Sequence, residues 1–124
     1  MYHATIRYVR ITPRKLRLVA DLIRNKPVSE AKKVLKFSAK RGASILMKLL
    51  NSAVANATQN PETDADSLYV KSIMVGDGVI MKRFRAAPQG RSVEIKKRTS
   101  HTTIVLDAKK KVAEKPKPKK EEKK

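Results

Sequence analysis

Cysteine is absent from this sequence, histidine occurs only twice, and the aromatic residues are three tyrosines and two phenylalanines. The absence of cysteine excludes disulfides, thiolate chemistry and cysteine-ligated zinc. The few scattered acids and histidines form no catalytic triad, no carboxylate pair within a motif and no metal-ligand spacing. We therefore expect no enzyme activity, no metal site and no cofactor.

Long apolar runs are also missing. No segment approaches the roughly eighteen consecutive apolar residues of a membrane span, and the N-terminus lacks the apolar region of a signal peptide. The sequence therefore predicts a soluble, cytoplasmic protein. We expect it neither to span a membrane nor to form a homo-oligomer.

Positive charge is in large excess. The 124 residues include 30 Lys and Arg against 11 Asp and Glu, which gives a formal net charge of +19. Self-repulsion at this charge destabilises a compact fold, so we expect a polyanionic partner that neutralises it. Nucleic acid is the leading candidate, and an anionic membrane surface is the second.

Hydrophobic periodicity predicts both strands and helices. Residues 1–11 alternate as a half-buried strand with Ile6, Tyr8 and Arg10 on one face. Thr12 and Pro13 have the types preferred for the N-cap and first residue of a helix, which the segment 25–27 ends. Further helices are predicted over 28–38 and 40–60, the last of them core rather than contact surface, and further strands over 68–75 and 99–106. The first helix has an apolar stripe of Leu16, Val19, Ala20 and Ile23.

The segment 78–101 is predicted to be a long β-hairpin arm. Its turn is Ala87-Pro88-Gln89-Gly90, where Pro and Gly suit the second and fourth positions. This turn would pair Phe84 with Val93 and Lys82 with Ile95, and farther along Ile73 with Ile104 and Lys71 with Leu106, although a bulge would shift the register by one. At ~3.3 Å per residue, the arm is about 33 Å long. Gly76-Asp77-Gly78 is interpreted as a turn before it.

The arm is cationic and has no hydrophobic face to stabilise it. It carries seven Lys and Arg against one acid, Glu94, and isolated hairpins are marginal in water. We therefore expect a polyanion to surround the arm and to stabilise it. The run 97–101 is a series of phosphate-binding donors, since Ser100 and His101 point to opposite faces of a strand and so form no catalytic pair. Phe84 is the arm's only aromatic residue, which argues against a stacking platform for single strands.

Basic residues of the first strand and helix extend the expected contact surface. The residues that we expect to bind nucleic acid are Arg7, Arg10, Arg14, Lys15, Arg17, Lys82, Arg83, Arg85, Arg91, Lys96, Lys97, Arg98, Thr99, Ser100 and His101. The acids of the loop 61–67 are expected to mark a side that faces solvent.

The C-terminal segment 109–124 has nine lysines, three glutamates and two prolines. Its few apolar residues cannot offset the entropy of ordering, so we expect a disordered basic tail. The chain is thus predicted to be a single domain over 1–108, with a body of 1–77 and 102–108 and an extended hairpin of 78–101.

Several segments resemble the family of large ribosomal subunit protein twenty-two. They are RYVRITPRK at 7–15, NSAVANA at 51–57, KRF at 82–84 and KRTSH at 97–101. The resemblance covers about residues 4–107, in order and at matching spacing. The chain departs from the family at Gly78-Val79, where the family usually has Gly-Pro, and at a tip with less arginine.

The resemblance implies an α+β body, with three helices packed on a small three-stranded antiparallel sheet. It also implies a structural constituent of the large ribosomal subunit that binds large-subunit ribosomal RNA, aids early subunit assembly and contacts neighbouring ribosomal proteins. The hairpin would line the polypeptide exit tunnel, where its tip would meet nascent chains and macrolides. The tip residues are Ala86, Ala87, Pro88, Gln89, Gly90 and Arg91.

Two other functions remain to be weighed. An architectural DNA-binding protein could insert the arm into a minor groove, but such arms usually carry an apolar wedge at the tip, and Ala-Ala-Pro-Gln is a weak one. An enzyme that uses Ser100 or His101 is a distant third.

Overall fold

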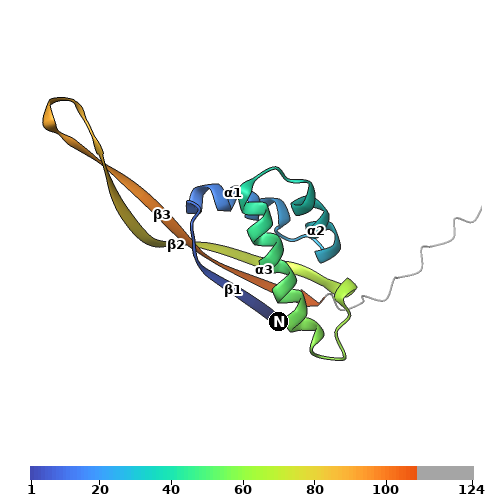
Figure 1. Ribbon diagram of the computed structural model, residues 1–124. Helices are drawn as coiled ribbons and strands as arrows, with labels where there is room; N and C mark the ends of the chain where they lie inside the picture. The colour runs from blue at the N-terminus through green and yellow to red at the C-terminus, as the bar shows by residue number, and fades with distance from the viewer. Residues whose placement is uncertain (109–124) are drawn as a thin grey trace, which may run out of the picture.

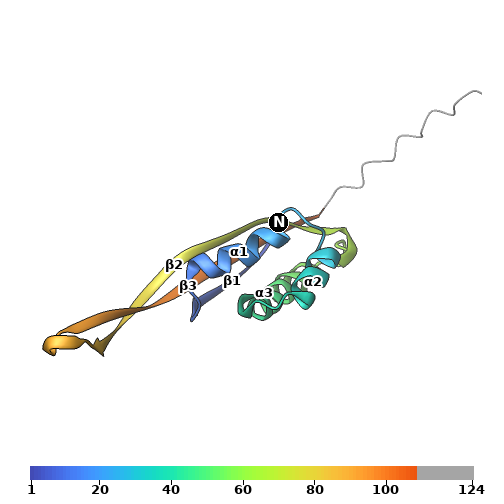
Figure 2. The ribbon, with the colours of Figure 1, turned by 90° about the horizontal axis from the view of Figure 1, so that it is seen from above.

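Three helices lie on one face of a three-stranded antiparallel sheet in the computed structural model, which describes residues 1–108 (Figure 1). The strand order is β1 (Tyr2–Val9), β3 (Ser92–Ala108), β2 (Leu68–Ala86), so the last strand in the chain is central. Figure 2 shows all three helices on the same side of the sheet. The expected α+β class, helix number and sheet are confirmed, whereas the predicted tail at 109–124 lies outside the described residues.

The helices have the predicted apolar stripes. They are α1 (Pro13–Ile23), α2 (Val28–Phe37) and α3 (Arg41–Thr58). Thr12 is the N-cap of α1, with Pro13 at its first position, and Asn25 adopts a positive φ of 61° just after its end. The buried hydrophobic residues of the core are all Ala, Val, Leu or Ile. The layer between the helices and the sheet is therefore mainly aliphatic.

The first strand departs from simple alternation. Tyr8 has a φ of 56°, and the pairing of β1 with β3 shifts between Ile6 and Val9. The irregularity inserts a residue, so that Ile6 and Val9 both face the core while Tyr8 is 63% exposed. The predicted face of Ile6, Tyr8 and Arg10 is therefore wrong beyond Ile6.

Two bulges in β2 set the register of the long hairpin. Ile73 pairs with Ile104 as predicted, but Leu106 pairs with Val70 because Lys71 is the extra residue of the first bulge. Beyond the second bulge, Phe84 pairs with Glu94 and not with Val93. Likewise, Lys82 pairs with Lys96 and not with Ile95. The hairpin loop has one residue more than the predicted turn, so the predicted register of the arm is wrong by one. The second bulge restores the predicted register in the body, and the first bulge shifts it again at Lys71.

The second bulge lies where the arm leaves the body. Gly78 and Val79 together oppose Thr99, so β2 continues through this segment without the predicted turn. A Cβ on Gly78 would clash with the Thr99 hydroxyl oxygen and lie 3.1 Å from the Thr99 carbonyl carbon, tighter than most real contacts. Glycine is therefore required at this position.

The hairpin loop is one residue longer than the predicted turn. The Ala87 amide donates to the Arg91 carbonyl oxygen at 2.9 Å, which leaves a loop of Pro88, Gln89 and Gly90. Gly90 has a positive φ of 68°, and Gln89 has one as well, 61°. The tip thus has a defined backbone shape built from small or uncharged residues.

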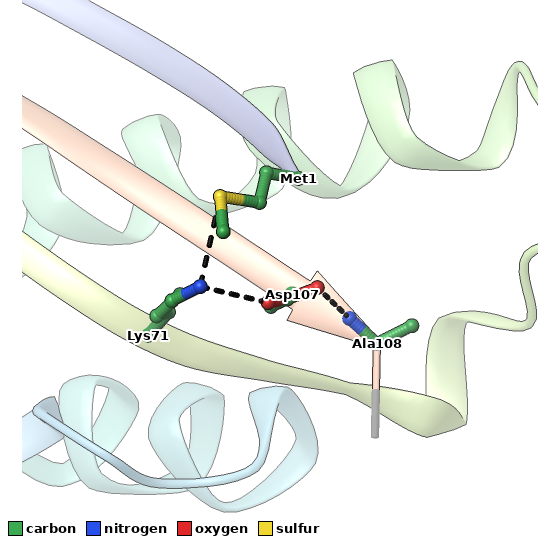
Figure 3. A network of polar contacts seen from close by, with 4 residues as sticks. All are labelled: Met1, Lys71, Asp107 and Ala108. Carbon is green, nitrogen blue, oxygen red and sulfur yellow. Dashed lines mark hydrogen bonds and ion pairs between the residues drawn. The ribbon is translucent and has the colours of Figure 1, made fainter. Parts of the chain in front are cut away.

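At the opposite end of the sheet, one polar network links the three strands (Figure 3). The Lys71 ammonium lies 3.1 Å from a carboxylate oxygen of Asp107 and 3.6 Å from the sulfur of Met1. The other carboxylate oxygen accepts the amide of Ala108 at 3.0 Å. Chiefly because of the hydrogen bond from Lys71, the pKa of Asp107 is held below its usual value.

Candidate nucleic-acid interface

A basic groove of about 850 Å³ lies between the helical body and the base of the arm. Its body wall includes Arg10, Lys15, Lys40 and Arg41, and its arm wall includes Arg83, Lys96, Lys97 and Arg98. None of the residues that line it is acidic. Lysine and arginine side chains that converge from two walls suit a phosphate backbone that passes between them.

Two helices begin at this groove. Thr12 is the N-cap of α1 and Lys40 that of α3, and neither helix has an acid in its first turn. Free amide groups at a helix N-terminus carry partial positive charge. They therefore add to the positive potential of the side chains around them.

The groove unites predicted site residues that are far apart in the sequence. Arg10 and Lys15 are brought beside Arg83 and the run 96–98. Lys40 and Arg41 were missed, because the strong apolar stripe of α3 indicated a core helix. The sequence feature that could have identified them is that they are two adjacent cations just before that stripe. The first turn of α3 is contact surface, in contrast to the rest of the helix.

The arm has two faces with different charge. Residues that pair across the hairpin share a face, and successive residues alternate between faces. The pairs 81/97, 83/95, 85/93 and 87/91 therefore form one face. This groove-side face carries the cations Arg83, Arg85, Arg91 and Lys97 and no acid.

The opposite face is more mixed. Here Lys82, Phe84 and Glu94 lie together with Lys96 and Arg98, and the last two also reach the lining of the groove. The Lys82 ammonium is 4.0 Å from the Glu94 carboxylate, so the arm's only acid offsets a cation on this face. The groove-side face therefore carries the larger net positive charge.

Arg17 and Arg24 have partners within the chain. The Arg17 guanidinium donates to the Val75 carbonyl oxygen at 3.1 and 3.2 Å and lies 3.7 Å from Asp77. Arg24 donates to the Ile73 carbonyl oxygen at 3.1 Å. Both side chains therefore cover the outer edge of β2, which would otherwise present unpaired carbonyl groups.

The run 97–101 contains one correction to the predicted site. The Thr99 and Ser100 side chains are buried, at 4% and 0% exposure, because they lie in the central strand. Their hydroxyls are not available to a phosphate in this structure. His101 points to the face of the strand opposite Ser100 and is half-buried. Its Nδ1 accepts the Tyr8 amide at 3.0 Å, and its ring packs edge-on against Tyr8.

The remaining predicted contacts lie on the surface. Arg7 and Arg14 are exposed but do not line the groove. The acids Glu62, Asp64 and Asp66 are exposed in the loop after α3. Figure 1 shows this loop at the end of the body away from the arm. The acids of this loop are thus separated from the groove along the length of the molecule.

The family model for ribosomal protein L22p/L17e matches residues 4–107. The chain belongs to this family. As an L22p/L17e protein it is a structural constituent of the large ribosomal subunit and not an enzyme. The expected location, the ribosome in the cytoplasm, follows from the same membership.

Curated relatives agree with the family match. Large ribosomal subunit protein uL22 of Syntrophus aciditrophicus (strain SB) is 54% identical over 106 residues, which cover 86% of this chain and 96% of the relative. The uL22 protein of Mycoplasma capricolum subsp. capricolum is 55% identical over 103 residues, covering 83% and 93%. That of Caldicellulosiruptor saccharolyticus is 54% identical over 103 residues, covering 83% and 84%. These alignments span nearly all of each relative.

The described part of this L22p/L17e chain has neither a membrane-spanning helix nor a cluster of metal ligands. Within 1–108, no helix has the length and apolar character needed to cross a membrane. The same part of the chain contains no group of three or more His, Asp or Glu placed to hold a metal ion.

Proposed function

We propose that this protein binds large-subunit ribosomal RNA with its groove and the groove-side face of its arm. The observation that carries the proposal is the groove itself, where eight cations from four separate segments meet without an acid. Each phosphate that a Lys or Arg neutralises releases counterions, so binding would be strong and salt-dependent. Membership in a ribosomal family makes ribosomal RNA, and not DNA, the expected polyanion.

The arm tip has a different role in this proposal. Ala86, Ala87, Pro88, Gln89 and Gly90 are uncharged and mostly small, and the loop backbone is fixed by its closing hydrogen bond. A surface of this kind offers little to phosphate but suits the wall of a channel along which other molecules pass. We infer that the tip, up to Arg91, lines the polypeptide exit tunnel and meets nascent chains.

The two roles together explain a contribution to early subunit assembly. The body and the base of the arm offer a preformed groove, whereas the rest of the arm extends away from the body as a two-stranded hairpin (Figure 1). RNA binding to the body would place the arm so that later RNA segments fold around it. Neighbouring large-subunit proteins would then contact surfaces that RNA leaves open.

Binding competition tests the RNA proposal. The full-length protein is titrated with a large-subunit ribosomal RNA transcript, and duplex DNA of equal phosphate concentration is used as competitor. Preference for the transcript at moderate salt is expected. Equal competition by duplex DNA would favour the architectural DNA-binding alternative.

Crosslinking tests the tip proposal. A photoreactive amino acid is placed at Gln89 in ribosomes that carry a stalled nascent chain, with a matched position at Arg83. Gln89 is expected to crosslink to the nascent chain and Arg83 to RNA. Crosslinks from Gln89 to RNA alone would remove the tip from the tunnel lumen.

A further inference from the structure

Both phenylalanines of this protein lie on its surface. Phe37 is 85% exposed and Phe84 is 72% exposed, whereas every buried hydrophobic residue in 1–108 is aliphatic. A phenylalanine ring gains more from burial than most side chains. Single exposed apolar residues are normal, so a function for the two rings has to be inferred from the residues around them.

Cations flank the ring of Phe84. On its own face of the arm, Lys82 and Lys96 lie to one side, while Ala86 and Ser92 lie toward the tip. Phe84 pairs directly with Glu94, and its neighbours in sequence are Arg83 and Arg85. No other large apolar residue shares this stretch of the face, so the ring is not part of an apolar patch.

Phe37 has similar surroundings. It is the last residue of α2, one turn beyond the exposed Lys33 and next to the exposed Lys36. The chain then continues to Lys40 and Arg41, which line the basic groove. This second ring is also isolated among cations.

These surroundings favour RNA over a protein partner. Lysine is depleted from the centres of protein–protein interfaces, where apolar residues cluster. An isolated ring flanked by Lys and Arg instead matches single-stranded RNA, in which an unpaired base stacks on the ring while phosphates meet the cations. The arm is no stacking platform, in agreement with its sequence, since it presents one ring and not a row.

We propose that Phe37 and Phe84 each stack on an unpaired base of the bound RNA. This inference rests on the proposed RNA-binding function and adds a second mode of contact to it. The groove binds phosphates of any RNA sequence, whereas the two rings bind only where the RNA has an unpaired base that can stack on them. RNA segments with unpaired bases at these two positions would thus be distinguished from regular duplex.

Tryptophan reporters test the stacking directly, because the natural sequence contains no tryptophan. Phe37→Trp and Phe84→Trp are made separately in the full-length protein and titrated with the large-subunit ribosomal RNA transcript. Met74→Trp is the control, since Met74 is 60% exposed on the sheet face away from the helices. Strong quenching is expected for the two reporters and little for the control. Equal emission changes at all three positions would overturn the inference.

Affinity and its salt dependence give a second readout. Phe84→Leu keeps an apolar side chain but loses the aromatic face, and should weaken binding by about 5- to 150-fold. Phe84→Tyr should bind as the natural protein does. The slope of log K against log salt should stay unchanged in both, because no phosphate contact is lost.

The outcomes separate the inference from the function on which it rests. A Phe84→Leu protein that binds the transcript with natural affinity contradicts stacking at that ring and leaves the groove unaffected. The same comparison with Phe37→Leu and Phe37→Tyr decides the second ring. If the natural protein itself shows no preference for the transcript, the RNA-binding proposal fails first.

Discussion

The Thr99 hydroxyl donates a hydrogen bond to the Val79 carbonyl oxygen at 2.7 Å, across the bulge where the arm leaves the body. Thr99 is 4% exposed, so its hydroxyl bonds within the hairpin and is not available to a binding partner. The bond satisfies a carbonyl group at the point where the strand register changes. Together with Gly78, it fixes the direction in which the arm extends from the sheet.

Gly78→Ala should destabilise the protein. The added methyl group would lie 3.1 Å from the carbonyl carbon of Thr99 and 3.2 Å from its oxygen, and backbone atoms cannot move aside without opening the bulge. We expect a loss of about 1–3 kcal/mol in the free energy of unfolding, measured by urea denaturation. Gly76→Ala is the control, because its Cβ would meet nothing closer than 3.9 Å. Equal effects at both positions would show that the bulge is not rigid.

Thr102→Val should stabilise the protein. The Thr102 side chain is fully buried, and within the described residues its hydroxyl has no hydrogen-bond partner. A valine of nearly the same shape removes that unsatisfied group, and we expect a gain of about 1 kcal/mol in the free energy of unfolding. Thr103→Val is the comparison, since the Thr103 hydroxyl lies 3.1 Å from that of Thr5 and its removal breaks a hydrogen bond. A Thr102→Val protein less stable than the natural one would contradict this.

Arg41→Gln should weaken RNA binding and reduce its salt dependence. Arg41 lines the groove, so the loss of one phosphate contact should lower the slope of log K against log salt by about 0.7–0.9. Lys48→Gln is the matched control, an exposed cation on the same helix that lies outside the groove. An unchanged slope for Arg41→Gln would exclude a direct phosphate contact by this residue.

Asp107→Asn should lose stability at neutral pH but not in strong acid. The hydrogen bond from Lys71 lowers the pKa of the Asp107 carboxyl below its ordinary 3.8, so the folded state favours the ionised form. The resulting stabilisation is complete above 3.8 and is lost as the pH falls through the lowered pKa. Thermal unfolding midpoints of the two proteins should therefore differ at pH 7 and converge in acid. A constant difference across this range would show that the pair with Lys71 is not its source.

Local patterns predicted the elements of the body correctly. Helix α1 has its N-cap, its first proline and its apolar stripe within one continuous segment, so residues near in sequence determine it. The same holds for the stripe of α3. The cationic arm was also predictable, because its charge and its turn residues are features of composition.

The errors have a common physical origin in contacts between distant residues. The αL conformation of Tyr8 and the two bulges of β2 depend on how strands fit against each other, and a single extra residue reverses every later side chain. The burial of Thr99 and Ser100 follows from the central position of β3, which the sequence order does not reveal. Lys40 and Arg41 become part of the groove only when the arm lies beside them.

The position of β3 in the sheet has a consequence for how the chain folds. Among residues 1–108, β1 and β2 pair only with β3, which is the last of the three strands to be translated. Tyr2 of β1, for example, can pair with Leu106 only after more than a hundred residues have been synthesised. The ladder between β1 and β3 therefore cannot form until nearly the whole described chain has been synthesised, although the hairpin pairs near the tip can form earlier. Pairings so distant in sequence slow folding, because a large loop must close before any contact rewards it. Until then the helices have no sheet to cover, so the body and the base of the arm should form in a single late step.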